Sequence, residues 1–458
     1  MGIGVSGWPL ANAVARRGQI GVVSGTGLDT VFARRLQEGD PGGHLRRSMA
    51  RFPVHGVAEE VLRQYFRPEG TPPDVPYRLV PMYRHVVSHA RERFSMLAAF
   101  VEVDLAREGH DGVVGLNLLT KAMVSNLALL YGAMLAGVDY VLMGAGIPRE
   151  IPAALDALAQ HQVATLKLDV DGLEGDRVEM LTFDPAAHGA PDRPALKRPR
   201  FLPIVSSHVL AMSMAKRPGV DGFVIEAPIA GGHNAPPRVD VPWNERGEPV
   251  YGPRDEVDLS KLRDLGKPFW LAGGAGRPEG LRDAIAQGAT GIQVGTLFAY
   301  CDESGITPEL KRSVLAAVKR GEVDVRTDPE ASPTGYPFKR VEWNEAPKET
   351  HPRERRCDLG YLRVAYVAGP DGTINYRCAS EPVEDYVRKG GHIEDTVGRQ
   401  CLCNGLLATV GLGQHQKDGS VELPMVTSGD DLKRLGAFLD GRDHYAAADV
   451  LDHLLSQR

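Results

Sequence analysis

The segment Gly288-Ala289-Thr290-Gly291-Ile292-Gln293-Val294 is the first indication of the fold class, because similar segments occur three times along the chain. In each copy a glycine follows a helix-like segment, and a short apolar run comes directly after it. Gly137-Val138-Asp139 and Gly219-Val220-Asp221 begin the other two copies. A helix that ends at glycine before a short apolar strand is typical of repeating βαβ units. Strands without polar alternation are buried on both faces, as in parallel sheets covered by helices.

Seven strands of this kind are expected, each separated from the next by helical segments. An eighth is expected either at Gly2–Ser6 or at Val163–Leu168. Eight parallel strands with alternating helices form an α/β protein of the (β/α)₈ or TIM-barrel type. An open doubly wound sheet is the alternative. The seven expected strands are residues 20–24, 113–117, 139–143, 201–205, 222–226, 269–272 and 291–295.

The length of 458 residues exceeds the roughly 250 of a compact barrel, so we expect large insertions and a C-terminal extension. Residues 1–322 are predicted to form the barrel, with insertions at 37–95 and 169–200, the second of them containing a hairpin. Residues 323–458 are predicted to contain a linker or wrapping arm over 326–356, a cysteine-containing region and C-terminal helices.

Composition narrows the class of protein. The formal net charge of −6 provides no basic face for nucleic acid. The chain lacks an apolar run of about 18 residues, so we expect no membrane span. The odd number of cysteines and the absence of a signal peptide favour a cytoplasmic location. The five cysteines are Cys301, Cys357, Cys378, Cys401 and Cys403.

Glycine-rich segments follow the last two expected strands. Ala272-Gly273-Gly274-Ala275-Gly276 follows one strand and Gly295-Thr296 follows the next. Barrels often bind phosphate with backbone N–H groups of the loops after strands seven and eight, and glycine lets the backbone approach an anion closely. The two loops therefore predict a site for one phosphate monoester.

A histidine follows an earlier strand, in the segment Ala230-Gly231-Gly232-His233. The two glycines leave a bare loop that presents the imidazole to a ligand. Imidazole titrates near pH 7 and suits a general base. A histidine in an ordinary surface loop is the alternative, but the neighbouring phosphate pocket favours a catalytic role for His233.

Four segments together resemble the nitronate monooxygenase family, formerly called 2-nitropropane dioxygenases, whose FMN barrel is shared with flavin-dependent enoyl-acyl-carrier-protein reductases. The resemblance covers roughly residues 1–300 without the insertions. It implies FMN as the cofactor, His233 as the catalytic base and no metal. The segments are Gly115-Leu116-Asn117-Leu118, Ala230-Gly231-Gly232-His233, Ala272-Gly273-Gly274-Ala275-Gly276 and Gln293-Val294-Gly295-Thr296. The implied FMN site comprises Asn117, Glu226, Gly231, Gly232, Gly273, Gly274, Gln293, Val294, Gly295 and Thr296.

The chain departs from the family pattern at three places. It begins at Met1-Gly2-Ile3-Gly4, inside the family's Gly-Gly-Met-Gly-like turn, so that either the first strand is absent or the true start lies upstream. Pro228 and Ile229 are extra residues, and Glu226 stands where the family has glutamine. Asn234-Ala235-Pro236-Pro237 replaces the usual glycine after the histidine. The last two departures bear on substrate specificity more than on FMN binding.

The resemblance implies oxidation of nitronates or nitroalkanes with O₂ to a carbonyl compound and nitrite, with a small molecule as substrate. An alternative is an FMN-dependent enoyl reductase that uses NAD(P)H and acts on an acyl group bound to a carrier protein. A third hypothesis, from another class, is a non-enzymatic flavoprotein that docks a partner.

Four of the cysteines cluster in the C-terminal region, namely Cys357, Cys378, Cys401 and Cys403. Four thiolates suit one zinc ion or an iron–sulfur cluster, although the spacing is not the double Cys-x₂-Cys pattern. Small buried thiols are the alternative. A metal site would require the sulfurs to converge to within about 4 Å of one another, because metal–sulfur bonds are about 2.3 Å long.

Overall fold

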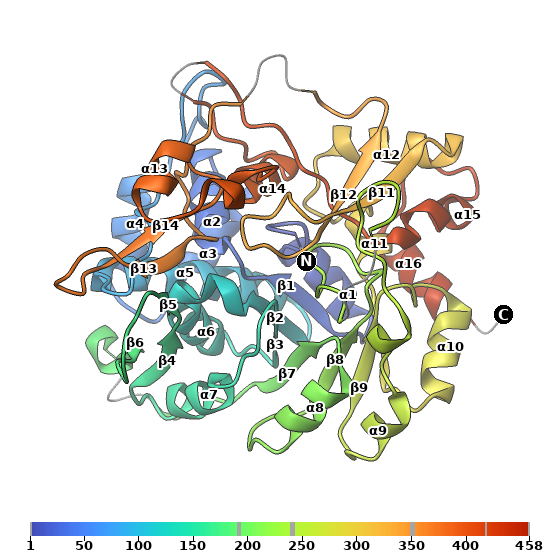
Figure 1. Cartoon of the computed structure of the whole chain (residues 1–458), viewed down its shortest axis with the longest axis horizontal. Helices are drawn as coiled ribbons and strands as arrows, with labels where there is room; N and C mark the ends of the chain where they lie inside the picture. Colours follow the sequence, from blue (N-terminus) through green and yellow to red (C-terminus); the bar gives the residue numbers. More distant parts are fainter. Residues whose placement is uncertain (1, 190–193, 239–242, 349–352, 417–418, 457–458) are drawn as a thin grey trace.

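The computed structural model describes residues 2–189, 194–238, 243–348, 353–416 and 419–456. At its centre is a seven-stranded sheet in the order β1-β2-β3-β7-β8-β9-β10 (Figure 1). Every pairing in it is parallel, and the seven expected strands are all confirmed. The strands are β1 (Gly21–Ser24), β2 (Val114–Leu119), β3 (Tyr140–Gly144), β7 (Arg200–Val205), β8 (Phe223–Glu226), β9 (Phe269–Ala272) and β10 (Gly291–Gln293).

The eighth strand is not found at either expected position. Val163–Leu168 contains β4 (Ala164–Leu168), but β4 pairs antiparallel with β6 (Glu179–Phe183) in a separate hairpin. Alternate residues of β4 are exposed, whereas a strand of the central sheet is covered on both faces. Gly2–Ser6 is irregular, and the backbone N–H of Ser24 donates to the Ser6 carbonyl at 2.8 Å. Within the described residues no pairing joins β10 to β1, so the sheet forms part of a barrel.

Helices connect the strands and cover the outer face of the sheet. Side-chain caps begin several of them; the Ser88 hydroxyl, for example, accepts a hydrogen bond from the Arg91 backbone N–H at the start of α5. The helices in this part of the chain are α1 (Trp8–Arg16), α2 (Leu28–Gln37), α3 (His44–Met49), α4 (Val57–Tyr65), α5 (His89–Ala106), α6 (Asn126–Leu135), α7 (Ile151–Ala159), α8 (His208–Ala215), α9 (Leu259–Arg263) and α10 (Pro278–Ala286).

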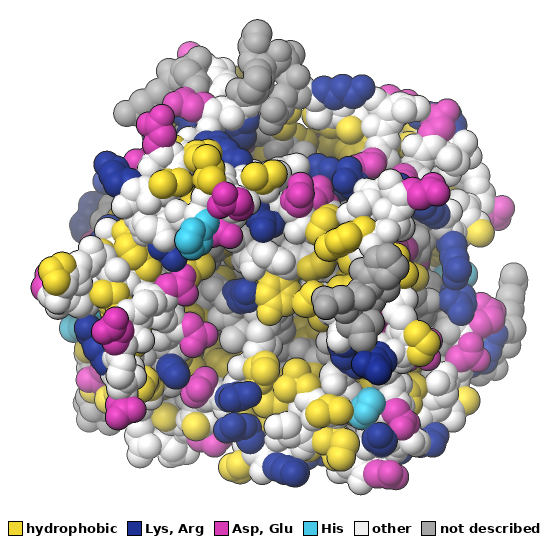
Figure 2. Space-filling model, in the orientation of Figure 1, with side chains coloured by type: hydrophobic (Ala, Val, Ile, Leu, Met, Phe, Trp, Pro, Cys, Tyr) yellow, Lys and Arg dark blue, Asp and Glu magenta, His cyan; other side chains and the backbone are white. Residues whose placement is uncertain are grey.

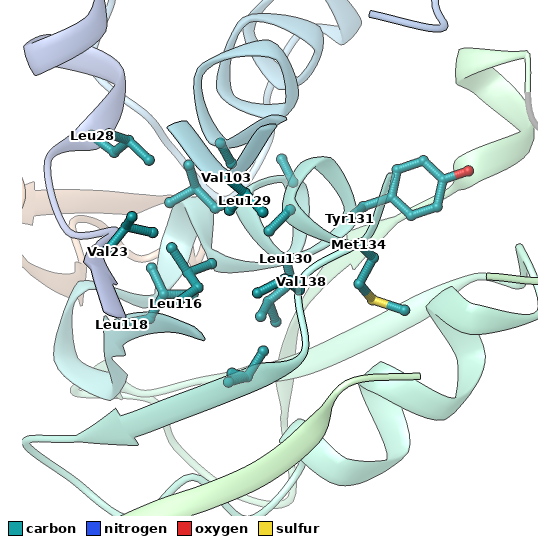
Figure 3. Close-up of a cluster of buried hydrophobic side chains, with 14 of the residues drawn as sticks. Val23, Leu28, Val103, Leu116, Leu118, Leu129, Leu130, Tyr131, Met134 and Val138 are labelled. Atoms are coloured by element: carbon teal, nitrogen blue, oxygen red, sulfur yellow. The ribbon is translucent and has the colours of Figure 1, made fainter. Parts of the chain in front are cut away.

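The largest apolar cluster lies between the first strands and helices α5 and α6 (Figure 3). Leu116 and Leu118 of β2 project toward Val103 of α5 and Leu130 of α6, and all four side chains are fully buried. Removing apolar surface from water at roughly 25 cal/mol per Å² is the main stabilising contribution of such a cluster. This core holds the strand ends, and therefore the loops that follow them, in fixed positions.

The C-terminal region packs on the same body. In the segment 326–356, expected as a linker or wrapping arm, residues 326–328 and 338–343 instead belong to an antiparallel pair of strands, β11 and β12, and residues 349–352 lie outside the described part of the chain. Charged and polar residues, some of them buried, stand between the buried apolar ones in both strands and obscure the apolar pattern in the sequence. The elements here are α11 (Thr296–Ala299), α12 (Pro308–Arg320), β11 (Val323–Asp328), β12 (Phe338–Trp343), β13 (Val364–Val367), β14 (Ile374–Arg377), α13 (Val383–Arg388), α14 (Leu402–Thr409), α15 (Leu435–Leu439) and α16 (Ala447–Leu454).

Two contacts tie this region to the strands and helices before it. Leu10 and Val14 of α1 share an apolar cluster with residues of α11, α12, α15 and α16. β13 pairs in parallel with β5 (Val170–Asp171), a short strand in the connection that follows β4. Helix α16 therefore lies beside α1, and α11, α12 and α15 pack in the same apolar cluster (Figure 1). The domain boundary at residue 322 stays a prediction.

Charged side chains of both signs are intermingled over the face of the molecule that Figure 2 shows. None of the helices that the structure describes combines the length and apolar character needed to cross a bilayer.

Candidate active site

A cavity lies at the carboxyl ends of the parallel strands. Six of the seven strands, or the loops directly after them, contribute to its wall. Gly2 and Ile3 at the N-terminus and residues of the C-terminal region supply the rest. The strand-side residues are Thr26, Asn117, Leu119, Gly144, Ala145, Ile204, Glu226, Gly231, Gly232, His233 and Gln293. The C-terminal residues are Phe338, Tyr361, Leu362, Leu402, Cys403, Leu406 and Thr427. A mostly apolar cavity with a few convergent polar groups is the usual form of a cofactor or substrate site.

His233 is held in this cavity by the C-terminal region. Its loop runs against β12, where the Lys339 N–H donates to the Gly232 carbonyl and the Asn234 N–H donates to the Pro337 carbonyl, each at 2.9 Å. The imidazole packs edge-on against Phe338, with ring centroids 4.9 Å apart. Backbone and ring contacts together therefore set its orientation.

The electrostatic state of His233 follows from its surroundings. Burial lowers the pKa of the imidazole to about 4, so the ring is neutral at pH 7. Its Nε2 lies 2.7 Å from Oγ of Ser332, a fully buried residue between β11 and β12. Neutral imidazole with one nitrogen engaged retains the other for exchange with a ligand.

Gly231 lies where the loop passes the C-terminal backbone. A Cβ at this position would stand 2.7 Å from the carbonyl carbon of Ser428, so only glycine fits without a shift. The next residue, Gly232, donates its N–H to the Thr427 hydroxyl at 2.9 Å. The two glycines that precede His233 therefore serve close packing of the loop against residues 427–428.

Three further expected residues face the same space. Asn117 is buried on β2, and its Nδ2 donates a long hydrogen bond of 3.4 Å to the Leu142 carbonyl. Glu226 ends β8, and burial raises the pKa of its carboxyl group to about 7. Gln293 ends β10 and lines the cavity. These groups can donate hydrogen bonds to, or accept them from, the polar edge of a bound ring.

One orphaned atom supports the fit of a flavin. Thr26 lines the cavity, and its hydroxyl oxygen is buried without a hydrogen-bond partner among the residues that the structure describes. Buried polar atoms are rarely left unpaired, because each one costs free energy. Apolar walls with an unpaired hydroxyl and a buried amide and carboxyl match the planar, polar-edged ring of FMN.

The glycine-rich loops lie beside this cavity but do not line it. Gly273 and Gly274 adopt positive φ angles of 89° and 74°, which favour glycine. A Cβ on Gly273 would stand 3.0 Å from the Ala230 backbone nitrogen, so the loop after β9 packs closely on the histidine loop. Val294, Gly295 and Thr296 follow β10 at the start of α11. The structure thus brings together Asn117, Glu226, Gly231, Gly232, His233 and Gln293 in one cavity and leaves Gly273, Gly274, Val294, Gly295 and Thr296 next to it.

Sequence reasoning missed the C-terminal wall of the site. Tyr361 lines the cavity, and its hydroxyl donates a short hydrogen bond to the carboxylate of Asp29 on α2. Arg91 of α5 donates to the same carboxylate. Burial acts to raise the pKa of Asp29, but Arg91 and the Tyr361 hydroxyl outweigh it and hold the pKa below its usual value. No local pattern marks these residues, because their partners lie far away in the chain.

The four C-terminal cysteines line a second, small cavity, which shares Leu362, Leu402 and Cys403 with the first. Within the described residues, no group of three or more His, Cys, Asp or Glu side chains is placed to hold an ion. Cys378 and Cys403 are buried, and Cys357 and Cys401 are half-buried.

The fold and this cavity define the class of protein, and comparison with known families agrees. Residues 155–328, from α7 to the end of β11, match the family model described as nitronate monooxygenase. The match confirms the resemblance seen in the motifs, and the chain is a flavin-dependent oxidoreductase of the FMN-using kind that acts on a small molecule. The hypothesis of a non-enzymatic flavoprotein is therefore wrong. No curated protein matches the sequence.

Several solved structures resemble the chain at low identity. FabK from Thermotoga maritima is 16% identical over 98% of this chain and 88% of that one, with a TM-score of 0.46. A nitroalkane oxidase from Streptomyces ansochromogenes is 14% identical over 99% and 92%, with a TM-score of 0.44. The enoyl reductase domain of MlnA from Bacillus amyloliquefaciens is 12% identical over 78% and 84%, with a TM-score of 0.43.

Proposed function

We propose that this protein oxidises nitronates and nitroalkanes with O₂, forming a carbonyl compound and nitrite. The observation that carries the proposal is a neutral, half-buried imidazole, His233, that lines an apolar cavity at the strand ends. An imidazole kept neutral at pH 7 can accept the proton from the carbon that bears the nitro group. The match of residues 155–328 to the nitronate monooxygenase family supports the same chemistry.

The residues that would hold FMN divide into two groups. Asn117, Glu226 and Gln293 would hydrogen-bond the polar edge of the ring, and Gly231 and Gly232 would let it approach the backbone closely. Gly273, Gly274, Val294, Gly295 and Thr296 would hold the phosphate through backbone N–H groups. When bound there, FMN supplies two-electron oxidation of the substrate and reaction with O₂.

The cavity wall suits a small substrate. Ile204, Leu402 and Leu406 are apolar, so a nitroalkane chain can pack against them while its nitro group meets polar atoms. The C-terminal residues in the cavity wall contribute to the burial that keeps His233 neutral. Ile204, Leu402 and Leu406 line the same cavity as the His233 imidazole.

The test is anaerobic reduction of the flavin in the purified, FMN-loaded protein. We expect propyl nitronate to bleach the absorbance near 450 nm, about the value typical of oxidised flavins, and NADPH to leave it unchanged. Reduction by NADPH but not by the nitronate would contradict the proposal and favour the enoyl reductase with a carrier-bound acyl group. Aerobic release of nitrite with the nitronate is the second readout.

A further inference from the structure

A carboxylate stands beside the loops expected to hold the flavin phosphate. The Thr296 hydroxyl donates a hydrogen bond of 2.5 Å to Oδ1 of Asp431, and the Gly429 N–H donates to the same hydroxyl oxygen at 3.2 Å. On the other loop, a Cβ at Gly276 would stand 3.7 Å from Oδ2 of Asp431. The side chain of Asp431 therefore touches the loop after β10 and lies close to the loop after β9.

Two features of this chain hold Asp431 in place. Ile229, one of the two extra residues after β8, accepts a hydrogen bond from the Asp430 N–H at 3.0 Å. Gly429 packs so closely that a Cβ there would stand 2.6 Å from Oδ1 of Asp431 and 2.9 Å from the Ile229 carbonyl oxygen. The segment 429–431 is thus fixed by its backbone, and Asp431 cannot move far without breaking these contacts.

Although a carboxylate stands close by, the free backbone N–H groups of the loop after β9 suit an anion. The N–H groups of Gly274, Ala275 and Gly276 have no hydrogen-bond partner within the described part of the chain. A phosphate that accepts from these N–H groups would carry up to two negative charges close to the Asp431 carboxylate. Like charges a few ångströms apart repel each other, and they do so more strongly at a protein surface than in bulk water.

We propose that Asp431 is a specificity-determining residue of the flavin site, whose carboxylate competes with the flavin phosphate for the Thr296 hydroxyl and lowers the affinity for FMN relative to riboflavin. This inference rests on the proposed FMN site. Riboflavin has the same ring without the phosphate, so Asp431 affects its binding little. The protein accordingly discriminates between the two flavins less than its glycine-rich loops would otherwise allow.

The protonation of Asp431 is consistent with the proposed competition between its carboxylate and the flavin phosphate. Burial raises the pKa of Asp431 above its usual value. The charged or titratable groups that act on it are Asp430 and Arg434 on its own segment and Tyr300 at the end of α11. A phosphate bound beside the carboxyl group would raise its pKa further, so binding of FMN takes up a proton and strengthens as pH falls.

The experiment measures dissociation constants for FMN and riboflavin by quenching of flavin fluorescence, with wild type, Asp431→Asn and Asp430→Asn. Asparagine keeps an acceptor for Thr296 and removes the charge. The matched control removes the same charge one residue away, from a side chain that is 40% exposed and bonded to Lys339. We expect Asp431→Asn to bind FMN about tenfold more tightly and riboflavin within about twofold of wild type, and Asp430→Asn to change both by less than about twofold.

The outcomes distinguish a failure of the role of Asp431 from a failure of the proposed flavin site. If Asp431→Asn binds FMN no more tightly while riboflavin binding is retained, the role of Asp431 is overturned and the flavin site stands. If neither flavin binds any of the three proteins, the proposed function falls and the inference with it. If Asp431→Asn does not fold, the FMN-to-riboflavin affinity ratio of wild type decides the question. The ratio must then rise as pH falls, and it must rise equally in wild type and in Asp430→Asn, because both proteins retain Asp431. A ratio that does not rise overturns the inference.

Discussion

His233 and Ser332 are 99 residues apart in the sequence, and their Nε2 and Oγ atoms lie 2.7 Å apart in the structure. The Ser332 oxygen also accepts from the Thr334 N–H at 3.2 Å and lies 2.8 Å from the Thr334 hydroxyl. A serine hydroxyl has one proton to donate and two lone pairs to accept with. When Ser332 donates to Thr334, it accepts from Nε2–H of His233, and the lone pair of the imidazole is on Nδ1.

This arrangement predicts a positioning role for Ser332. In Ser332→Ala the imidazole is free to turn and to change tautomer, so flavin reduction by neutral nitroethane should slow, by less than the ~10²–10⁴-fold typical of losing a general base. FMN affinity should not change. The ¹⁵N chemical shifts of His233 should show the loss of the single tautomer, a readout that a purely structural role would not move.

Ser380→Ala is the matched control for Ser332→Ala, because Ser380 is equally buried and its hydroxyl donates to the Gln400 carbonyl at 2.7 Å. Equal rates in the two variants, with an unchanged His233 tautomer, would contradict the positioning role.

His233→Asn tests the base itself. The variant should retain FMN and lose about 10²–10⁴-fold in the rate of flavin reduction by a neutral nitroalkane. It should lose much less with preformed nitronate, which is already deprotonated. Stopped-flow measurements with both substrates give the comparison. Equal losses would indicate substrate positioning rather than proton abstraction, and loss of FMN or of solubility would indicate a structural histidine.

The raised pKa of Glu226 predicts that the free energy of unfolding depends on pH. Its pKa is raised to about 7 in the folded protein from a usual value of 4.5, so the folded state binds the proton more tightly than the unfolded state. The free energy of unfolding should therefore fall as pH rises from about 4.5 to about 7, by at most ~3 kcal/mol, and should not fall further above that range. Glu226→Gln should remove this loss.

Urea unfolding of the apoprotein at pH 5, 6, 7 and 8 measures the effect of Glu226→Gln. Glu309→Gln, on the exposed surface of α12, controls for the loss of one negative charge. A stability difference between Glu226→Gln and wild type that stays constant from pH 5 to pH 8 would show that Glu226 is not destabilised by burial.

We expect the hydrogen bond between Tyr361 in the cavity wall and Asp29 on α2 to stabilise the folded protein. Tyr361→Phe removes the hydrogen bond to the buried Asp29 carboxylate and should lower the free energy of unfolding by about 1.5–3 kcal/mol, as expected for a bond to a charged group. Tyr140→Phe is the control, because its hydroxyl accepts from Arg200 at an exposed site. An effect no larger than that of Tyr140→Phe would refute a stabilising role for the Tyr361–Asp29 contact.

The sequence was sufficient for the parallel strands and for the residues at their ends. Runs such as Val141-Leu142-Met143 and Phe223-Val224-Ile225 are apolar throughout, and short-range preferences select a buried strand wherever a helix ends at glycine before such a run. Because parallel strands end at one edge, Asn117, Glu226 and Gln293 could be expected to meet. The prediction that Val163–Leu168 forms a strand of the barrel was wrong for the same reason. Its local pattern predicts a strand correctly but contains no information about which sheet the strand joins.

The partners of these residues depended on contacts between distant segments. Ser332 beside His233, Asp431 beside Thr296 and Tyr361 beside Asp29 come from a C-terminal region whose own sequence contains no catalytic motif. Such contacts form when complementary surfaces of segments about a hundred or more residues apart pack together, and the free energy of that packing is a property of the whole core. The position of each strand is encoded by the residues in and next to it. The wall that orients His233, and the placement of the Asp431 carboxylate beside the phosphate loops, exist only after the chain has folded.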